Sequence, residues 1–593
     1  MTNITVSLKY LWQSLASFNK RKIILLFLLN IVNAVAEVVS IGSIIPIVSL
    51  MMNESNILKY PMLDRVLSNI PGLSHNKVLA LLVVFAMITI IVGVIRYVTL
   101  VFTNKLAFSI SSNVAVKVYS NALYKPYPIH LKENSSEMIS DLTIKINSMI
   151  SGIFIPLLTF VNSFFIVFSI LVALFVISPM VATVIVVVFG GAYWIISKRA
   201  VKKLHLNSGL IVKLDEKLIK LIQESLGGIR EINLEGNQKY YIKTFSAINT
   251  PLRNAQSENV IAGTSPRYFV ETLGIITICA VAILSVSFNH SGSDIFPVIA
   301  AFAFSAQRIL PTAQLLYTSW SSLVGNSVAM NRLANEVRIN YKGSESSEHN
   351  KMDISVGFEF KDVSFQYDLQ HPNVIQNVNL NIPVGSRIGV VGKTGMGKTT
   401  LMDILMGLLE PTSGQILIDG VELTQDNIKK WRNAIAHVPQ NIYLSDLSIK
   451  DNIAFGLNNE EIDMERVHAA AKKAQLHDFI MQLPEKYDTQ VGERGVRLSG
   501  GQRQRIGIAR ALYKQAEIVI FDEATSALDS ETEEKIMQSI YESGDNVTLF
   551  IIAHRVSTLR LVNTIFEVKN KKVMIHDSYD GYVLLSQTEN ILK

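Results

Sequence analysis

Long apolar runs in the first 340 residues constrain this chain more than any other feature. A bilayer core of about 30 Å is crossed by about 20 helical residues, and most of these runs reach that length. The alternative, in which each run is a core helix of a soluble protein, is disfavoured because six of them occur in one half of the chain. The predicted membrane spans, of which the fourth is short, are residues 23–51, 78–102, 153–177, 181–196, 260–288 and 295–323.

The rest of the chain has a different pattern. After about Met352, short β-rich runs alternate with Gly/Pro turns and helical stretches, which is typical of a soluble α/β domain. The intervening segment Lys342–Asn350 is polar and rich in small residues, as in an exposed linker. The sequence therefore predicts a transmembrane domain at 1–340, a linker at 341–353 and a soluble domain at 354–593.

Loop charges predict the orientation of the membrane domain. The stretch from Lys198 to Arg253 is rich in Lys and Arg, whereas the short loops after Ile177 and Phe288 contain neither. The basic stretch is therefore predicted to be cytoplasmic, and with six spans the soluble domain lies on the same side. These loops and anionic lipid headgroups account for the net charge of +6, so no nucleic-acid partner is expected.

The soluble part contains a phosphate-binding motif. Residues 392–399 fit the pattern G-x-x-x-x-G-K-[ST], in which backbone N–H groups wrap phosphates, Lys398 supplies charge and the Thr399 hydroxyl reaches Mg²⁺. An apolar run further along ends in Asp522 and Glu523, as in a buried parallel strand that places one carboxylate near the metal and the next beside the attacking water. ATP and Mg²⁺ are therefore the expected substrate and cofactor.

Between these two elements, residues 498–502 read Leu-Ser-Gly-Gly-Gln. With this signature motif, the chain from about residue 354 resembles the nucleotide-binding domain of ATP-binding cassette (ABC) transporters, and Thr489–Gly495 resembles the segment that distinguishes exporters of this family from importers. The resemblance implies an α-helical membrane domain of six transmembrane helices, as in type I/IV ABC exporters, joined to an α/β P-loop domain. It also implies an ATP hydrolase coupled to transport.

The resemblance assigns roles to single residues. Tyr367 corresponds to the aromatic side chain that stacks on adenine, Gln440 to the glutamine that links catalysis to the membrane domain, and His554 to the histidine at the γ-phosphate. The expected catalytic residues are Glu523, His554 and Gln440, and the expected metal ligands are Thr399, Gln440 and Asp522. The expected ATP-binding residues are Tyr367, Gly392, Lys393, Thr394, Gly395, Met396, Gly397, Lys398, Thr399, Thr400, Ser499, Gly500, Gly501 and Gln502.

The chain has one phosphate-binding motif and one signature motif. In the resembled family ATP is held between the first motif of one domain and the signature of a second, so Ser499 and Gly501 of a partner would complete the site. The predicted working unit is a homodimer. A heterodimer with a different half-transporter is the alternative, but the intact motifs favour the homodimer.

The family resemblance also predicts how the membrane domain is mechanically coupled to the nucleotide-binding domain. In these exporters the membrane helices continue beyond the bilayer, and short transverse helices at their turns dock onto the nucleotide-binding domains. The corresponding turns are expected near Pro128–Met138 and Glu224–Glu235, where Gly227 and Gly228 permit a sharp bend.

Charged residues within the apolar spans are the main clue to the transported molecule. An ionised side chain that faces lipid costs at least about 2.5 kcal/mol, so these residues should face a water-filled cavity or pair for structural reasons. The arginines outnumber the acids, and guanidinium groups match phosphate oxygens well. The predicted cavity residues are Arg96, Arg267 and Arg308, with Glu37 and Glu271 nearby.

The sequence around these arginines indicates a class of transported molecule. Ile95–Tyr97, Ser265–Tyr268 and Gln307–Pro311 resemble stretches of the bacterial flippases for lipid-linked oligosaccharides. The leading hypothesis is therefore an ATP-driven flippase of the bacterial inner membrane for a lipid-linked saccharide of the polyprenyl pyrophosphate type. The alternatives are an exporter of a drug, a peptide or a lipid A-type glycolipid, and a non-transport role in gating or sensing.

Overall fold

The computed structural model divides the chain into two compact units. The first comprises Met1–Lys125 and Lys132–Ser344, and the second comprises Pro126–Leu131 and Glu345–Lys593. The residues that the structure describes are 2–15, 17–43, 46–47, 77–177, 179–287, 292–339, 341, 351–368, 370–525, 527–541, 546–552, 559 and 562–583.

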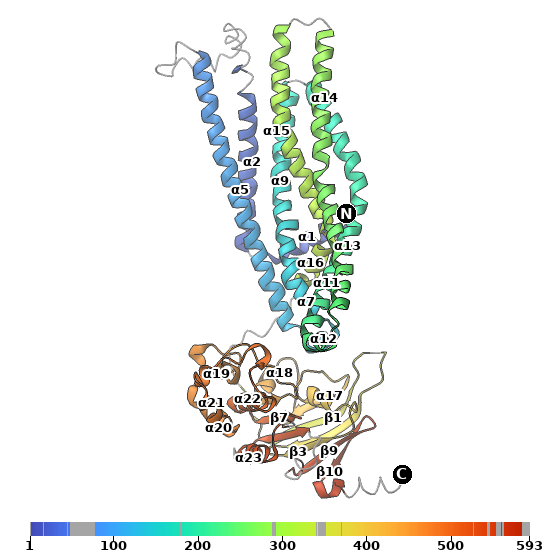
Figure 1. Ribbon diagram of the computed structural model, residues 1–593, viewed down its shortest axis with the longest axis vertical. Coiled ribbons are helices and arrows are strands. Elements are labelled where there is room, and N and C mark those ends of the chain that lie inside the picture. Colours follow the sequence, from blue (N-terminus) through green and yellow to red (C-terminus); the bar gives the residue numbers. More distant parts are fainter. Residues whose placement is uncertain are drawn as a thin grey trace. The chain divides into compact units, whose positions relative to one another are not determined.

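The described part of the first unit is helical, and its longest helices run lengthwise (Figure 1). Short π-helical segments interrupt two of the long helical stretches, at Asp141–Lys145 and Ile150–Phe154 before α9 and at Val186–Gly190 between α10 and α11. Its α-helices are α1 (Thr2–Ser14), α2 (Ser17–Gly42), α5 (Lys77–Tyr124), α7 (Ser135–Ser140), α8 (Ile146–Met149), α9 (Ile155–Ile177), α10 (Pro179–Ile185), α11 (Gly191–Gly227), α12 (Ile229–Glu235), α13 (Gln238–Thr264), α14 (Pro266–Ser287), α15 (Gly292–Gly325) and α16 (Ser327–Arg338). The short helix α6 (Tyr127–Lys132) falls, except for its last residue, in the second unit.

Four stretches within the described residues are long and apolar enough to cross a membrane: Ser17–Gly42, Val78–Tyr124, Ser135–Val176 and Ala182–Gly227. They overlap the first four predicted spans. Helix α14 lies within the fifth predicted span, whose first residues belong to the end of α13, and α15 includes the whole of the sixth. The part of the first predicted span beyond residue 47 lies outside the described residues.

Several helices are much longer than the apolar runs from which they were predicted. The run that predicted a span at 78–102 belongs to a helix of 48 residues, which is about 72 Å long at 1.5 Å per residue. Its second half, from Phe102 to Tyr124, is more polar, and the helix continues because its residues are ordinary helix formers with no Pro or Gly to end it. The turn regions expected at 128–138 and 224–235 contain the short helices α6, α7 and α12.

An ionic network ties together three elements of the first unit. Lys145, whose side chain is 3% exposed, lies 2.5 Å from Asp141 and 2.8 Å from Glu216 of α11. Arg332 of α16 contacts the same two carboxylates. Because burial of a charge is tolerated only with partners, the network fixes α16 against α11 and the helical stretch before α9.

The second unit contains two sheets. In the four-stranded sheet, with order β2-β1-β4-β5, all neighbours are antiparallel; in the six-stranded sheet, with order β10-β9-β3-β8-β7-β6, only the β9–β10 pair is antiparallel. The strands are β1 (Gly357–Phe365), β2 (Ile375–Pro383), β3 (Arg387–Val391), β4 (Ser413–Ile418), β5 (Val421–Glu422), β6 (Ile435–Val438), β7 (Ile518–Asp522), β8 (Thr548–Ile552), β9 (Thr564–Lys569) and β10 (Lys572–His576). The helices are α17 (Lys398–Leu405), α18 (Ile428–Asn433), α19 (Ile449–Ile453), α20 (Met464–Lys473), α21 (His477–Gln482), α22 (Gly500–Tyr513) and α23 (Ser530–Tyr541).

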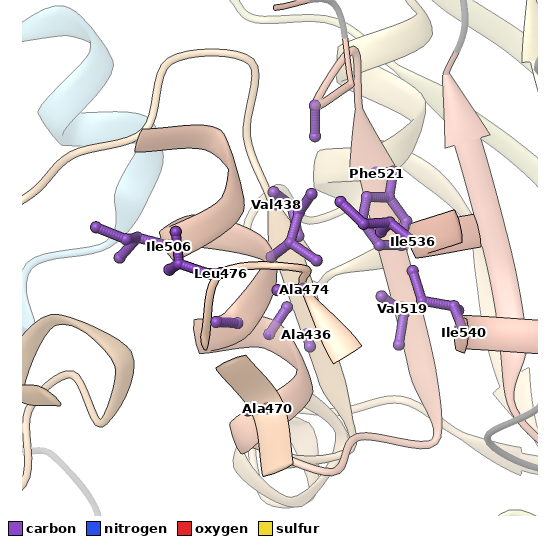
Figure 2. Packing of buried hydrophobic residues seen from close by; sticks show 14 of the residues in the cluster. Ala436, Val438, Ala470, Ala474, Leu476, Ile506, Val519, Phe521, Ile536 and Ile540 are labelled. Atoms are coloured by element: carbon purple, nitrogen blue, oxygen red, sulfur yellow. The ribbon is translucent and has the colours of Figure 1, made fainter. Parts of the chain in front are cut away.

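Apolar side chains of the parallel sheet form the core that positions the strand ends. Figure 2 shows Val438 of β6 and Phe521 of β7 packed close to Ile536 of α23, and all three are buried. A second cluster of buried apolar residues includes Phe358, Phe550 and Trp431. Trp431 is fully buried, and its indole N–H donates a hydrogen bond of 2.7 Å to the carbonyl oxygen of Leu405. Both clusters hold neighbouring strands in register, so the residues that follow these strands meet at one edge of the sheet.

Candidate active site and membrane cavity

The phosphate-binding motif forms the turn from β3 into α17. Gly392, Gly395 and Gly397 have φ values of 150°, 80° and 99°, a conformation that favours glycine. A Cβ atom on Gly392 would lie 2.5 Å from the carbonyl oxygen of Val568. The loop therefore requires glycine for backbone reasons, and it leads into a helix N-terminus, where unpaired backbone N–H groups favour anions.

The lysine of this motif is folded onto its own loop. Lys398 Nζ donates hydrogen bonds to the carbonyl oxygens of Gly392 at 2.7 Å and Lys393 at 3.4 Å. The ammonium group is thus held over the loop, where phosphate oxygens of a nucleotide would meet it. A glycine loop, a helix N-terminus and a centred lysine fit a nucleoside triphosphate.

Tyr367 lies beside the same helix. Its hydroxyl is 3.1 Å from Oγ1 of Thr400, and its ring packs edge-on against Phe365 with centroids 5.0 Å apart. The side chain is 40% exposed, so a ring face is accessible for stacking. The structure brings the predicted adenine-binding residue next to the predicted phosphate loop.

Two predicted catalytic residues contact each other at the ends of neighbouring parallel strands. Gln440 follows β6 and Glu523 follows β7, and Gln440 Nε2 donates a hydrogen bond of 2.7 Å to Glu523 Oε2. Glu523 has φ of +50°, and its backbone N–H donates to the carbonyl oxygen of Ile552 at 3.1 Å. A left-handed conformation costs a non-glycine residue roughly 1–2 kcal/mol, and such strain concentrates at functional sites. Asp522 precedes it as the last residue of β7.

One further acidic residue of this site was missed by the sequence analysis. Burial raises the pKa of the Asp403 carboxyl on α17 to about 6, and the nearby charge of Asp522 adds to the effect. The only sequence signal was an acidic residue within the apolar second half of the helix, Leu401–Leu405. The carboxyls of Asp403 and Asp522 thus lie close enough to interact on the side of the loop where the metal ligand Asp522 is predicted.

The signature motif caps another helix. Ser499 Oγ accepts a hydrogen bond from the backbone N–H of Gln502 at 3.3 Å, and Gln502 Oε1 accepts one from the backbone N–H of Ser499 at 2.8 Å, which together make a capping box for α22. A Cβ on Gly501 would lie 3.1 Å from the carbonyl oxygen of Ala527, while Gly500 packs near the same residue. Figure 1 shows α17 and α22 apart within the second unit, so the signature motif is not beside the phosphate loop of its own chain.

The remaining predicted residues of the nucleotide site divide into two groups. Lys393, Thr394, Met396 and Thr399 lie in or directly after the loop, in the turn from β3 to α17. His554 lies outside the described residues.

In the first unit, a cavity of about 550 Å³ is lined by α2, α5, α9 and α15. Arg96 and Arg308 both line it, together with Glu37, whose carboxylate forms an ion pair with Nε of Arg96. The structure therefore brings together two of the three predicted cavity arginines and one of the two acids. Further polar lining residues are Asn33, Thr99, Thr103, Asn104, Thr159, Asn162, Ser163, Gln307 and Thr312.

The third predicted cavity arginine lies elsewhere. Arg267 of α14 is not among the residues that line this cavity, and its Nε donates to Glu271 Oε1 at 2.6 Å. The arginine side chain is 59% exposed. Its partner is four residues further along the same helix, a spacing that already indicates a local ion pair in the sequence.

Taken together, the glycine loop after β3, the acidic residues after β7, the capping-box signature and the membrane helices define an ABC exporter. Residues 375–526 match the ABC transporter family and residues 22–307 match the ABC transporter transmembrane region, and the chain belongs to this family. It is a multi-pass membrane protein with an ATP-binding domain, in which ATP hydrolysis is coupled to transport.

The chain is also similar to individual proteins of this class. The chain is 31% identical over 496 residues to the ATP-dependent lipid A-core flippase of Saccharophagus degradans, covering 82% of each chain. It is 29% identical over 549 residues, with 90% of each covered, to an uncharacterized ABC transporter ATP-binding protein of Sinorhizobium fredii. Its fold is similar to that of a bacterial Atm1-family ABC exporter with ATP bound, with a TM-score of 0.76 and 21% identity over 92% of this chain and 96% of that one. The predicted exporter fold is confirmed.

Proposed function

We propose that this exporter moves a lipid-linked oligosaccharide of the polyprenyl pyrophosphate type from the cytoplasmic to the outer leaflet of a bacterial inner membrane. The observation that carries the proposal is the polar cavity within the membrane helices, lined by Arg96 and Arg308. Arginine at this depth costs several kcal/mol unless it is solvated or paired, and its planar fork suits phosphate oxygens. An anionic pyrophosphate is therefore the favoured occupant.

The carboxylate of Glu37 lowers the net positive charge of the cavity. Glu37 Oε1 holds Nε of Arg96, so one arginine is already neutralised locally while Arg308 contributes a second positive charge. A pyrophosphate can take the terminal guanidinium nitrogens of Arg96 without breaking that pair. Arg267, exposed and paired with Glu271, is proposed as a separate contact of the transported molecule outside this cavity.

ATP hydrolysis would proceed at the second unit. Glu523 accepts the proton of the attacking water, and the hydrogen bond from Gln440 orients its carboxylate. Lys398 would exchange its loop carbonyls for phosphate oxygens, and Tyr367 would stack on the base. The family resemblance assigns the contact with the γ-phosphate to His554.

Mg²⁺ is the proposed cofactor. Thr399, Gln440 and Asp522 would hold it, since a hydroxyl, an amide oxygen and a carboxylate at the end of β7 are hard oxygen ligands of the kind that Mg²⁺ prefers. When bound, Mg²⁺ neutralises charge on the phosphates of ATP. The raised pKa of Asp403, caused first by burial and then by Asp522, is consistent with a site built to receive positive charge.

The proposed working unit is a homodimer. Within the second unit the capping-box signature lies apart from the phosphate loop, so Ser499 and Gly501 would reach a nucleotide bound to the loop of a second chain. Each chain would contribute a transmembrane domain at 1–340, a linker at 341–353 and a cytoplasmic nucleotide-binding domain at 354–593.

A lipid A-type glycolipid is the second candidate for transport. It is favoured by the name of the Saccharophagus degradans relative, an ATP-dependent lipid A-core flippase. A drug or an apolar peptide is disfavoured because the cavity walls carry several amide, hydroxyl and guanidinium groups.

The proposal is tested by Arg308→Ala in proteoliposomes that contain a fluorescent polyprenyl pyrophosphate-linked saccharide. Flipping should fall to background while basal ATPase activity persists, because the phosphate loop belongs to the other unit. Arg308→Lys should restore part of the rate, since a point charge lacks the two-pronged geometry. Arg253→Ala, which removes an exposed arginine of α13 bonded to Gln256, is the matched control and should flip normally. Flipping by Arg308→Ala at the rate of the unmodified protein would contradict the proposal.

A further inference from the structure

One face of α2 carries an unusual polar stripe. Asn30, Asn33, Glu37 and Ser40 recur at intervals of three or four residues and are each at most 2% exposed, in a helix apolar enough to cross a membrane. This spacing places all four side chains on one side of the helix. Apolar residues would pack there at lower cost, so the polar atoms need partners.

Two of these side chains line the cavity, and each has an acceptor atom with no hydrogen-bond partner among the residues that the structure describes. The Nδ2 atom of Asn33 donates to Oδ1 of Asn162 at 3.3 Å, which leaves Asn33 Oδ1 as an unpaired acceptor. Glu37 Oε1 holds Arg96, whereas Glu37 Oε2 is buried and has no partner within the described part of the chain. A buried acceptor without a donor costs about 1–3 kcal/mol, and more when it is charged.

Hydroxyl groups on the same walls add to this excess of acceptors. Thr99 and Thr312 both line the cavity, and each donates its hydroxyl proton to a carbonyl oxygen one turn earlier in its own helix, at 2.8 Å to Ile95 and 3.0 Å to Arg308. Their Oγ1 atoms can therefore only accept from a ligand. The cavity thus combines guanidinium donors, which suit anionic oxygens, with acceptors, which suit O–H and N–H donors.

A ligand that satisfies both sets carries negative oxygens directly beside hydroxyl or amide donors. A sugar with a phosphate on its anomeric carbon has this chemistry, since its ring hydroxyls and any acetamido N–H lie next to the phosphate. The volume of about 550 Å³ falls within the usual range of about 300–1,000 Å³ for small-molecule sites, which suits the phosphate and the first sugar but not a long glycan.

We propose that this cavity recognises the sugar attached to the phosphate, through Asn33, Glu37 and the two threonines, and makes no specific contact with the outer sugars of the glycan. The inference rests on the proposed function, because it assumes that the phosphate lies on Arg96 and Arg308. The same chemistry is present in a polyprenyl pyrophosphate-linked saccharide and in a phosphorylated, acylated disaccharide of the lipid A type.

Equilibrium binding to the full-length protein in lipid nanodiscs tests the inference. Three probes are compared: a short prenyl pyrophosphate, the same molecule with one N-acetylhexosamine, and the same molecule with a trisaccharide. The first sugar should tighten binding and the second and third should add nothing. Asn33→Leu and Thr312→Val should each weaken binding of the sugar-bearing probe by about 3- to 10-fold, as expected for one lost hydrogen bond, and leave the sugar-free probe unchanged.

Two matched controls separate recognition from helix packing. Asn30→Leu removes an equally buried asparagine of α2 that does not line the cavity, and Thr318→Val removes a threonine of α15 that also donates to the carbonyl one turn earlier, at 2.9 Å to Gln314. Both controls should bind all probes normally. If Asn33→Leu and Thr312→Val bind the sugar-bearing probe as tightly as the unmodified protein, the acceptors are satisfied by water and the inference is wrong.

The two proposals fail in different ways. Arg308→Ala should weaken binding of all three probes, and an unchanged affinity for the sugar-free pyrophosphate would overturn the proposed function itself. An acylated disaccharide phosphate added as a competitor distinguishes the two lipid sources. Displacement of the prenyl probe at a lower concentration than the unlabelled prenyl compound would assign the cavity to a lipid A-type molecule and retain sugar recognition.

Discussion

The contact between Gln440 and Glu523 leads to a quantitative prediction for catalysis. Gln440→Ala removes the amide that donates at 2.7 Å to the carboxylate, and a hydrogen bond to a charged group contributes about 1.5–3 kcal/mol. Because this pair is exposed, the lower value applies. At 1.36 kcal/mol per tenfold change, kcat for ATP hydrolysis should fall about 10-fold. Glu523→Gln removes the base itself and should cost about 10²- to 10⁴-fold.

The double variant tests whether the two residues act together. If Gln440 acts by orienting Glu523, its loss has no further effect once the carboxylate is gone, so Gln440→Ala combined with Glu523→Gln should be no slower than Glu523→Gln alone. Rates are measured at saturating ATP and Mg²⁺, so that weaker metal binding does not enter the comparison. Gln425→Ala, which removes an exposed glutamine bonded to Glu410 at 3.4 Å, is the control. Rate losses that multiply in the double variant would refute the orienting role.

Two further predictions concern the second unit. Mixed dimers of a Lys398→Ala chain with a Ser499→Arg chain keep one composite site with both faces intact, so part of the ATPase activity should reappear relative to either variant alone; no recovery in purified mixed dimers would argue against a shared site. Asp403 has a pKa raised to about 6, by burial first and by Asp522 second, from 3.8, so its stabilising contribution is complete below pH 3.8 and is lost as the pH rises through about 6. Thermal unfolding should therefore show Asp403→Asn more stable than the unmodified protein at pH 7 and equal to it near pH 4, and an equal stability at both pH values would contradict the assigned shift.

Much of the nucleotide site was predictable because its residues follow strand ends at fixed spacings. The glycine pattern of residues 392–399 specifies a backbone that only glycine adopts easily, and the structure gives Gly392 and Gly397 positive φ values. The proximity of Gln440 to Glu523 follows once β6 and β7 are neighbouring parallel strands, since residues after adjacent parallel strands meet at one edge. Asp403 was missed because its pKa depends on burial, which a single sequence does not reveal.

The membrane half was less predictable in detail. Hydropathy located the spans but not the end of α5, because apolar residues in the second half of that helix alternate with polar ones and form no continuous run. Arg96, Arg267 and Arg308 are equivalent in sequence, as arginines within apolar runs, but two share a cavity and the third pairs locally with Glu271. The contact of Arg96 with a residue 59 positions away depends on how α2 packs against α5, and no local pattern encodes it.

The ion pair between Glu37 and Arg96 also bears on how the protein enters the membrane during synthesis. An ionised side chain within a span raises the cost of insertion by up to about 2.5–3.5 kcal/mol, and Glu37 lies in α2, which is made before α5. Its partner is translated 59 residues later, so the charge is unmatched until α5 has emerged. We expect α2 to be integrated stably only together with α5. Loss of Arg96 should then appear first as a lower yield of correctly inserted protein, before any defect in transport.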